Sequence, residues 1–166
     1  MNGSDIVSKY IKYVIFTLCL IIFCLLAIHV YKGNDFYSDN IIYNFISKYI
    51  ISDGMTPFVK MITWFGSTIG IIVMCKISLF VFRNKRVKIS IVVNLIIVTI
   101  LNNILKLIFM RPRPYLNTLV HETSYSFPSG HSMISIVFYG YLIYLIYKFI
   151  SNKKIKWPLI CLLSNL

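Results

Sequence analysis

The chain has 166 residues, of which 58% are hydrophobic and only 13% are charged. A water-soluble domain carries about 25% charged residues, so this composition is typical of a membrane protein and argues against a soluble domain. The formal net charge of +12 arises mostly from short basic runs between apolar segments, which favours contact with anionic lipid headgroups over binding of nucleic acid. At this length we expect a single domain, residues 1–166.

The first apolar run extends from Tyr10 to Tyr31 and is long enough to cross a membrane as a helix. Lys9 and Lys12 flank its beginning, so the positive-inside rule places the N-terminus in the cytoplasm. In residues 38–52, apolar side chains then recur at helical spacing. This pattern indicates either an amphipathic helix on the outer membrane surface or a helix packed against neighbouring spans.

The second apolar run, from about Pro57 to Phe82, is predicted to form one continuous span. It contains Gly66, Ser67 and Gly70, small residues that allow close contact with a neighbouring helix. The densest basic segment of the chain follows at residues 83–88. By the positive-inside rule, this segment is predicted to be a cytoplasmic loop.

The third apolar run, from about Ile89 to Met110, carries a polar stripe in its outer half. Its members are spaced so that they share one helix face: Thr99, Asn102, Asn103 and Lys106. Polar residues within a span usually face the bundle interior and mark a functional path. The two asparagines alone are better explained as contacts between helices, but the stripe ends in an ammonium group, which needs a counter-ion when it is buried.

Pro112 and Pro114 are predicted to end this helix near Met110. Residues 111–130 then form an outer loop, and a fourth span follows from His131 to about Ile150.

A second basic flank, residues 148–156, is predicted to be cytoplasmic. The fifth apolar run, Pro158 to Leu166, has nine residues, whereas a span needs about 20. We therefore expect an incomplete fifth helix in a C-terminally truncated chain. The predicted fold is all-α, a multi-pass transmembrane helix bundle with four complete spans and this incomplete fifth.

Residues on both sides of the outer loop form a candidate phosphate site: Lys106, Arg113, Ser129, Gly130 and His131. An ammonium and a planar guanidinium supply positive charge, and Gly130 lets a phosphate approach the first backbone N–H groups of the fourth helix. Ser129 also suits the N-cap of that helix, and a cap and an anion site are compatible there. The His131 imidazole is the candidate general acid, which can give a proton to a leaving alcohol.

Further residues are candidates for the rim of this site or for supporting contacts: Arg111, Asn102, Asn103 and Pro128. Arg111 either adds a third positive charge or holds headgroups at the rim. The loop has one acid, Glu122, and the four cysteines have no metal-site spacing. We therefore expect phosphate chemistry without a metal or another cofactor.

Lys106 is followed by six residues and then by Arg113-Pro114, and the next motif is Pro-Ser-Gly-His, from Pro128 to His131. These two motifs, in this order and at facing ends of consecutive spans, resemble those of the type 2 phosphatidic acid phosphatase family, which is related to the vanadium haloperoxidases. Together with the pattern of spans, the resemblance covers roughly residues 55–166.

The resemblance implies a bundle of six membrane helices that removes phosphate from lipid phosphates on the non-cytoplasmic face, without metal and through a phosphohistidine. It implies that Lys106 and Arg113 hold the phosphate, that Ser129 and Gly130 donate hydrogen bonds to it, and that His131 is the general acid. Phosphatidic acid, phosphatidylglycerol phosphate and polyprenyl pyrophosphate suit these residues equally.

A third family motif, Ser-Arg, five residues, His, three residues and Asp, does not occur in the 166 residues. The resemblance implies that this motif supplies another phosphate-binding arginine, the nucleophilic histidine and the aspartate that orients it. If the fifth span starts at Pro158, the motif is expected beyond about residue 177. Neither His29 nor His121 stands in a matching context, so we expect negligible phosphatase activity from this chain alone.

Two other functions remain open at this stage. A catalytically inactive membrane protein would use the same cations to bind anionic lipid headgroups without turnover. A small transporter would explain polar residues within spans, but the sequence shows no internal repeat, and the Arg-Pro and Ser-Gly-His elements would then have no purpose.

Overall fold

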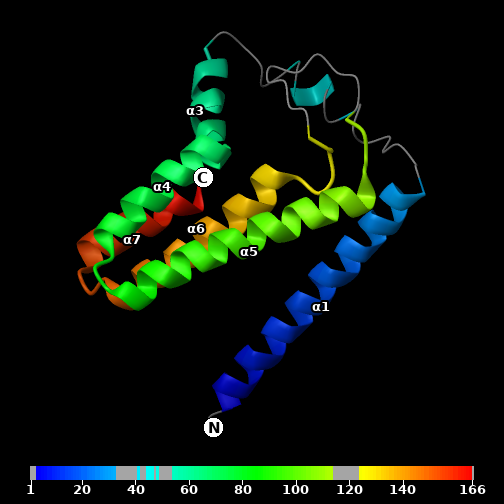
Figure 1. Cartoon of the computed structure of the whole chain (residues 1–166). Coiled ribbons are helices and arrows are strands. Elements are labelled where there is room, and N and C mark those ends of the chain that lie inside the picture. Colours follow the sequence, from blue (N-terminus) through cyan, green and yellow to red (C-terminus); the bar gives the residue numbers. More distant parts are fainter. Residues whose placement is uncertain are drawn as a thin grey trace.

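The computed structural model describes residues 3–32, 41, 44–46, 48, 54–113 and 124–165. The regular elements in these ranges are all helices, which confirms the predicted all-α class. They are α1 (Gly3–Tyr31), α3 (Thr56–Gly66), α4 (Thr68–Val81), α5 (Lys85–Phe109), α6 (Gly130–Phe149) and α7 (Lys153–Ser164), shown in Figure 1. The helix predicted on the outer surface at residues 38–52 lies mostly outside the described residues.

Three helices of the described part are long and apolar enough to cross a membrane, and they confirm the predicted first, third and fourth spans: Tyr10–Tyr31, Lys85–Phe109 and Gly130–Phe149. The span formed by α5 begins earlier than predicted, because Asn84 is the N-cap of this helix. Its side-chain oxygen accepts a hydrogen bond from the Arg86 N–H at 2.9 Å. Many apolar side chains on these helices are exposed, as expected for surfaces that face lipid.

The second span is not the continuous helix that the sequence predicted, because the chain bends by 61° between α3 and α4. Ser67 lies at the break in an extended conformation, with a ψ of 160°. Its hydroxyl accepts a hydrogen bond from the Gly70 N–H at 3.1 Å. The serine that we had interpreted as a small packing residue is therefore the N-cap of a new helix.

Replacement of Gly70 with alanine is expected to destabilise this bent pair by about 1–3 kcal/mol, the usual cost of overpacking. A Cβ atom at Gly70 would overlap the Trp64 carbonyl oxygen and lie 2.9 Å from the Phe65 Cα, so backbone would have to move. Thermal unfolding in detergent measures the effect. The control is Gly54→Ala, because nothing lies within 4 Å of a Cβ at that position. Equal unfolding midpoints for the two variants would contradict the close packing of Gly70 against the end of α3.

The fifth helix also begins earlier than the sequence suggested. α7 starts at Lys153, where the Asn152 side chain accepts a hydrogen bond from the Lys154 N–H at 3.0 Å. The sequence predicts a helix that starts at Pro158, but this proline lies inside α7. A proline there removes one backbone hydrogen bond, and packing of α7 along α6, with Leu163 buried, offsets that loss.

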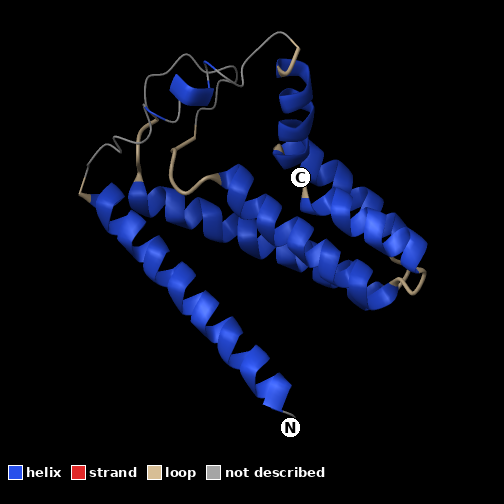
Figure 2. Ribbon diagram, turned by 180° about the vertical axis from the view of Figure 1, so that it is seen from behind, coloured by secondary structure: helices blue, strands red, loops and turns tan. Residues whose placement is uncertain are grey.

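α6 is the central helix of the bundle. α5 and α7 both pack along it, α3 contacts it, and α4 contacts α5 (Figures 1 and 2). The buried core is built mainly from α6, with contributions from α4, α5 and α7: Phe138, Tyr139, Leu142, Leu145, Ile146, Ile71, Val87, Ile91 and Leu163.

α1 leans away from the other helices and meets α5 through its C-terminal half (Figures 1 and 2). There Phe23 stacks on Phe127 with ring centroids 6.0 Å apart and meets Phe109 edge-on at 6.5 Å. Phe109 in turn meets Phe127 edge-on at 5.1 Å. This cluster of three rings connects α1 to the end of α5 and to the loop that precedes α6.

Candidate phosphate-binding site

The end of α5 and the start of α6 lie at the same end of the bundle, away from the loops at 82–84 and 150–152 (Figure 1). Lys106 is in the last turn of α5. Met110 then adopts the left-handed conformation, with a φ of 43°, and donates its backbone N–H to the Lys106 carbonyl at 2.9 Å. Pro112 disfavours continuation of the helix, so the chain leaves α5 where the sequence predicted.

Ser124 contacts both of the predicted phosphate-binding cations. The Lys106 ammonium donates a hydrogen bond to the Ser124 hydroxyl at 2.8 Å, and the Arg113 Nε–H donates one to the Ser124 carbonyl at 2.9 Å. The two cations therefore converge on one residue of the loop. Ser124 is not among the site residues that the sequence predicts, because the position of a loop serine carries no signal of contacts 18 and 11 residues away.

A second serine, Ser126, forms hydrogen bonds with the segment that follows α5. Its backbone N–H donates to the Arg111 carbonyl at 2.9 Å, and its hydroxyl donates to the carbonyls of Arg111 and Pro112 at 3.1 and 3.0 Å. These bonds hold the two sides of the loop together next to Arg113. They involve the backbone of Arg111, so a role for its guanidinium at the rim stays a prediction.

α6 begins at Gly130, and Ser129 is its N-cap. The Ser129 hydroxyl accepts hydrogen bonds from the Ser132 N–H at 3.3 Å and from the Ser132 hydroxyl at 3.1 Å. A Cβ atom at Gly130 would lie 3.3 Å from the Asn102 Oδ1 and 3.8 Å from the Lys106 Nζ. Because Gly130 has no side chain, the ammonium can approach a helix N-terminus, where backbone N–H groups and the helix dipole favour an anion.

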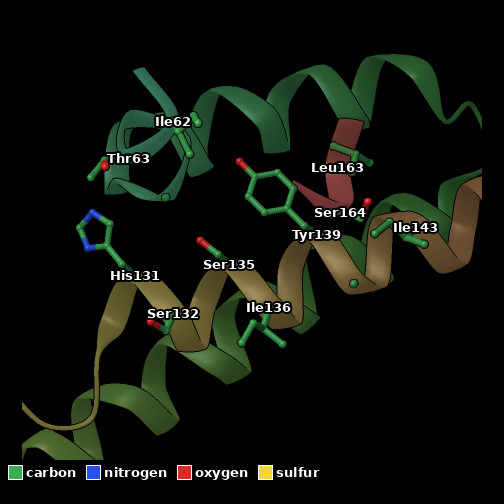
Figure 3. A pocket seen from close by; sticks show the side chains of 12 residues that line it. Ile62, Thr63, His131, Ser132, Ser135, Ile136, Tyr139, Ile143, Leu163 and Ser164 are labelled. Atoms are coloured by element: carbon green, nitrogen blue, oxygen red, sulfur yellow. The ribbon is translucent and has the colours of Figure 1, made fainter. Parts of the chain in front are cut away.

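His131 follows directly but faces a different neighbour. A Cβ atom at Gly66 of α3 would lie 3.1 Å from the His131 Cδ2. Figure 3 shows the imidazole at one end of a cavity of about 520 Å³, lined by residues of α3, α6 and α7. The structure thus brings Lys106, Gly130 and His131 to one helix end, with the ammonium near α5 and the imidazole near α3.

The supporting candidates occupy different environments. Asn102 is only 3% exposed, and its Nδ2 donates to the Met133 Sδ at 3.5 Å, so it packs α5 against the first turn of α6. Pro128 is also buried. Asn103 is exposed on α5, so only one of the two asparagines lies in the interior.

Positive charge dominates the described part of the site. Lys106, Arg111 and Arg113 all lie within it, and neither of its two segments, residues 102–113 and 124–132, contains an acidic residue. Among the described residues, no group of three or more His, Cys, Asp or Glu side chains is arranged to hold a metal ion. The arrangement suits an anion with several oxygens, and a phosphate group has that chemistry.

Comparisons with known proteins match this site to one family. Residues 88–165, which include both motifs, match the model of the PAP2 superfamily. Phosphatidylglycerophosphatase B of Bacillus subtilis is 45% identical over 58 residues, which are 33% of this chain and 29% of that protein. The chain therefore matches less than a third of the length of this curated relative.

A solved structure has a similar fold. It is the crystal structure of a transmembrane PAP2-type phosphatidylglycerolphosphate phosphatase from Bacillus subtilis, with a TM-score of 0.65 and 24% sequence identity. The alignment covers 87% of this chain and 75% of that chain. At this identity the likeness shows a shared fold, and the family match covers the residues of the site. The matched segment, residues 88–165, belongs to the PAP2 superfamily, as the two motifs predicted.

Proposed function

We propose that this chain binds the phosphate of a lipid headgroup between Lys106, Arg113 and the start of α6, as part of a PAP2-type lipid phosphatase. The observation that carries the proposal is the convergence of both cations on Ser124, with the ammonium beside Gly130. Charge-assisted hydrogen bonds to phosphate oxygens are about twice as strong as neutral ones. An ammonium, a guanidinium and a helix N-terminus together can bind several oxygens of one phosphate.

In the proposed reaction, the P–O bond to the lipid alcohol breaks, and His131 donates its proton to the departing oxygen. The two cations offset the charge on the equatorial phosphoryl oxygens. The family resemblance implies that a second histidine attacks the phosphorus and that water then releases phosphate from it. We assign that role to no residue of this chain, and His121 lies outside the described residues. The scheme uses neither a metal nor another cofactor.

Phosphatidylglycerol phosphate is a candidate substrate, because the relatives are named for it. Phosphatidic acid and polyprenyl pyrophosphate offer the same terminal phosphate. We also infer that the N-terminus is cytoplasmic and that the site lies on the non-cytoplasmic face. The support for this orientation is charge, because the basic segments at 83–88 and 148–156 lie at the opposite end of the bundle from the site (Figure 1).

A paired binding and turnover experiment tests the proposal. The purified 166-residue chain in detergent is titrated with dioctanoyl phosphatidic acid, and dioctanoylglycerol serves as the phosphate-free control. We expect saturable binding of the first lipid only. We expect phosphate release no faster than that of His131→Gln, because the chain has no assigned nucleophile. Equal binding of both lipids would contradict the site, and release that depends on His131 without any additive would mean that the chain holds its own nucleophile.

The alternative function, headgroup binding by a catalytically inactive protein, gives a different result when an external nucleophile is supplied. Imidazole at high concentration is expected to raise phosphate release by the unaltered chain and to have less effect on His131→Gln, because only the former can protonate the leaving alcohol. A protein that only binds headgroups would show the same background release in both cases.

A further inference from the structure

The break between α3 and α4 removes the Phe65 carbonyl from the regular hydrogen-bond pattern of a helix. In a continuous helix, the Phe65 carbonyl would accept a hydrogen bond from the backbone four residues later. α3 ends at Gly66, so this bond is replaced by one from another helix: the Tyr139 hydroxyl donates to the Phe65 carbonyl at 2.8 Å. Tyr139 belongs to α6 and is only 3% exposed. The bend is therefore connected directly to the helix that begins at the phosphate site.

The residue after Phe65 packs against the proposed general acid. A Cβ atom at Gly66 would lie 3.1 Å from the His131 Cδ2, 3.2 Å from the Ser135 Oγ and 3.9 Å from the His131 Cβ. His131, Ser135 and Tyr139 are spaced four residues apart, so they lie on one face of α6. Figure 3 shows this face turned toward α3. A side chain at position 66 would therefore press against the imidazole.

We propose that Gly66 and Tyr139 are positioning residues for the His131 imidazole. Tyr139 fixes the end of α3 relative to α6, and Gly66 then restricts the ring on the side that faces the cavity. The cavity of about 520 Å³ offers space into which an unrestricted ring would rotate, away from a phosphate held on the α5 side. This inference rests on the proposed function, in which His131 must lie within hydrogen-bond distance of the leaving oxygen.

Both positions have matched controls on α6. Gly66→Ala adds a methyl group against the imidazole, whereas Gly140→Ala adds one where nothing lies within 4 Å of the new Cβ, although Gly140 lines the same cavity. Tyr139→Phe removes one hydroxyl and keeps the ring. Its control is Tyr144→Phe, because Tyr144 lies on the same helix with an exposed ring.

The experiment measures the rate at which diethyl pyrocarbonate modifies each histidine, by mass spectrometry of the full chain after digestion. Tyr139→Phe is expected to speed modification of His131 by roughly 3- to 20-fold, which corresponds to the loss of one hydrogen bond between membrane helices. Gly66→Ala is expected to change the rate for a different reason, because the added methyl group would press against the imidazole and displace it. His29, on α1, is the internal reference and should keep its rate.

A second readout separates positioning from general structural damage. Saturating dioctanoyl phosphatidic acid is expected to protect His131 from modification in the unaltered chain and in both control variants. In Tyr139→Phe the protection is expected to fall while the affinity for the lipid changes less than about twofold, because Lys106 and Arg113 still hold the phosphate.

The two proposals fail in distinguishable ways. If Tyr139→Phe leaves both the rate and the protection of His131 unchanged, Gly66 and Tyr139 do not position the ring, whatever the lipid affinity. If phosphatidic acid does not bind selectively to the unaltered chain, the proposed function is wrong, and the positioning role that rests on it is withdrawn. Should Gly66→Ala fail to fold, Tyr139→Phe decides the question alone.

Discussion

Replacement of Lys106 with alanine is expected to lower the affinity for dioctanoyl phosphatidic acid by roughly 10- to 100-fold, because one charge-assisted hydrogen bond contributes about 1.5–3 kcal/mol. The ammonium lies 2.8 Å from the Ser124 hydroxyl and 3.8 Å from the position of a Cβ atom at Gly130. An anion at the start of α6 would thus lie next to it. Isothermal titration in detergent gives the dissociation constant.

The control for Lys106→Ala is Lys85→Ala, which removes the same charge from the first residue of the same helix, at the opposite end. It is expected to change the affinity less than about twofold, because charges separated by much more than a Debye length of about 8–10 Å are screened. Equal losses in the two variants would show that the lipid responds to net charge alone and would remove the reason for placing the phosphate beside Gly130.

Replacement of Phe138 with alanine is expected to destabilise the bundle by roughly 2 kcal/mol, from the cavity term of about 24 cal/mol per Å³ for a lost ring of roughly 100 Å³. Phe138 is 1% exposed and lies in the core of the central helix. In a membrane the transfer term is small, because lipid tails are as apolar as the core, so the lost packing carries most of the effect. Unfolding of the detergent-solubilised protein in SDS measures the change.

The matched variant is Ile136→Ala, two residues earlier on α6, where the side chain is 73% exposed. It is expected to have a much smaller effect, because its side chain is already exposed at the edge of the cavity between α3, α6 and α7, so that its removal leaves no new buried space. A larger loss for Ile136→Ala than for Phe138→Ala would mean that α6 presents a different face to its neighbours than the structure shows.

The positions of the apolar spans could be predicted from the sequence, because each span depends only on the length of its own apolar run. A membrane helix needs about 20 apolar residues, and the runs at Tyr10–Tyr31, 89–110 and 131–150 meet this condition whatever surrounds them. The end of α5 could also be predicted, because Pro112 disfavours a helical conformation of the residue before it. The closeness of Lys106 to Gly130 follows from two motifs at facing ends of consecutive spans.

The bend at Ser67 could not be predicted from the sequence. A serine near Gly66 and Gly70 suits close helix contact as well as it suits an N-cap. Only the contact partners decide between these roles, and the partners of this bend include Tyr139, 74 residues away from Phe65. The start of α7 was missed for a related reason. A proline suits the first turn of a helix, and its place inside α7 depends on packing along α6.

The sequence by itself determined the class of the protein, the location of its membrane helices and the chemical character of its site, because composition, apolar length and motif chemistry are properties of short segments. Only the tertiary structure decided that Ser124 joins the two cations and that His131 packs on Gly66. These contacts connect residues that lie far apart in the chain, and their geometry depends on how three helices pack against one another.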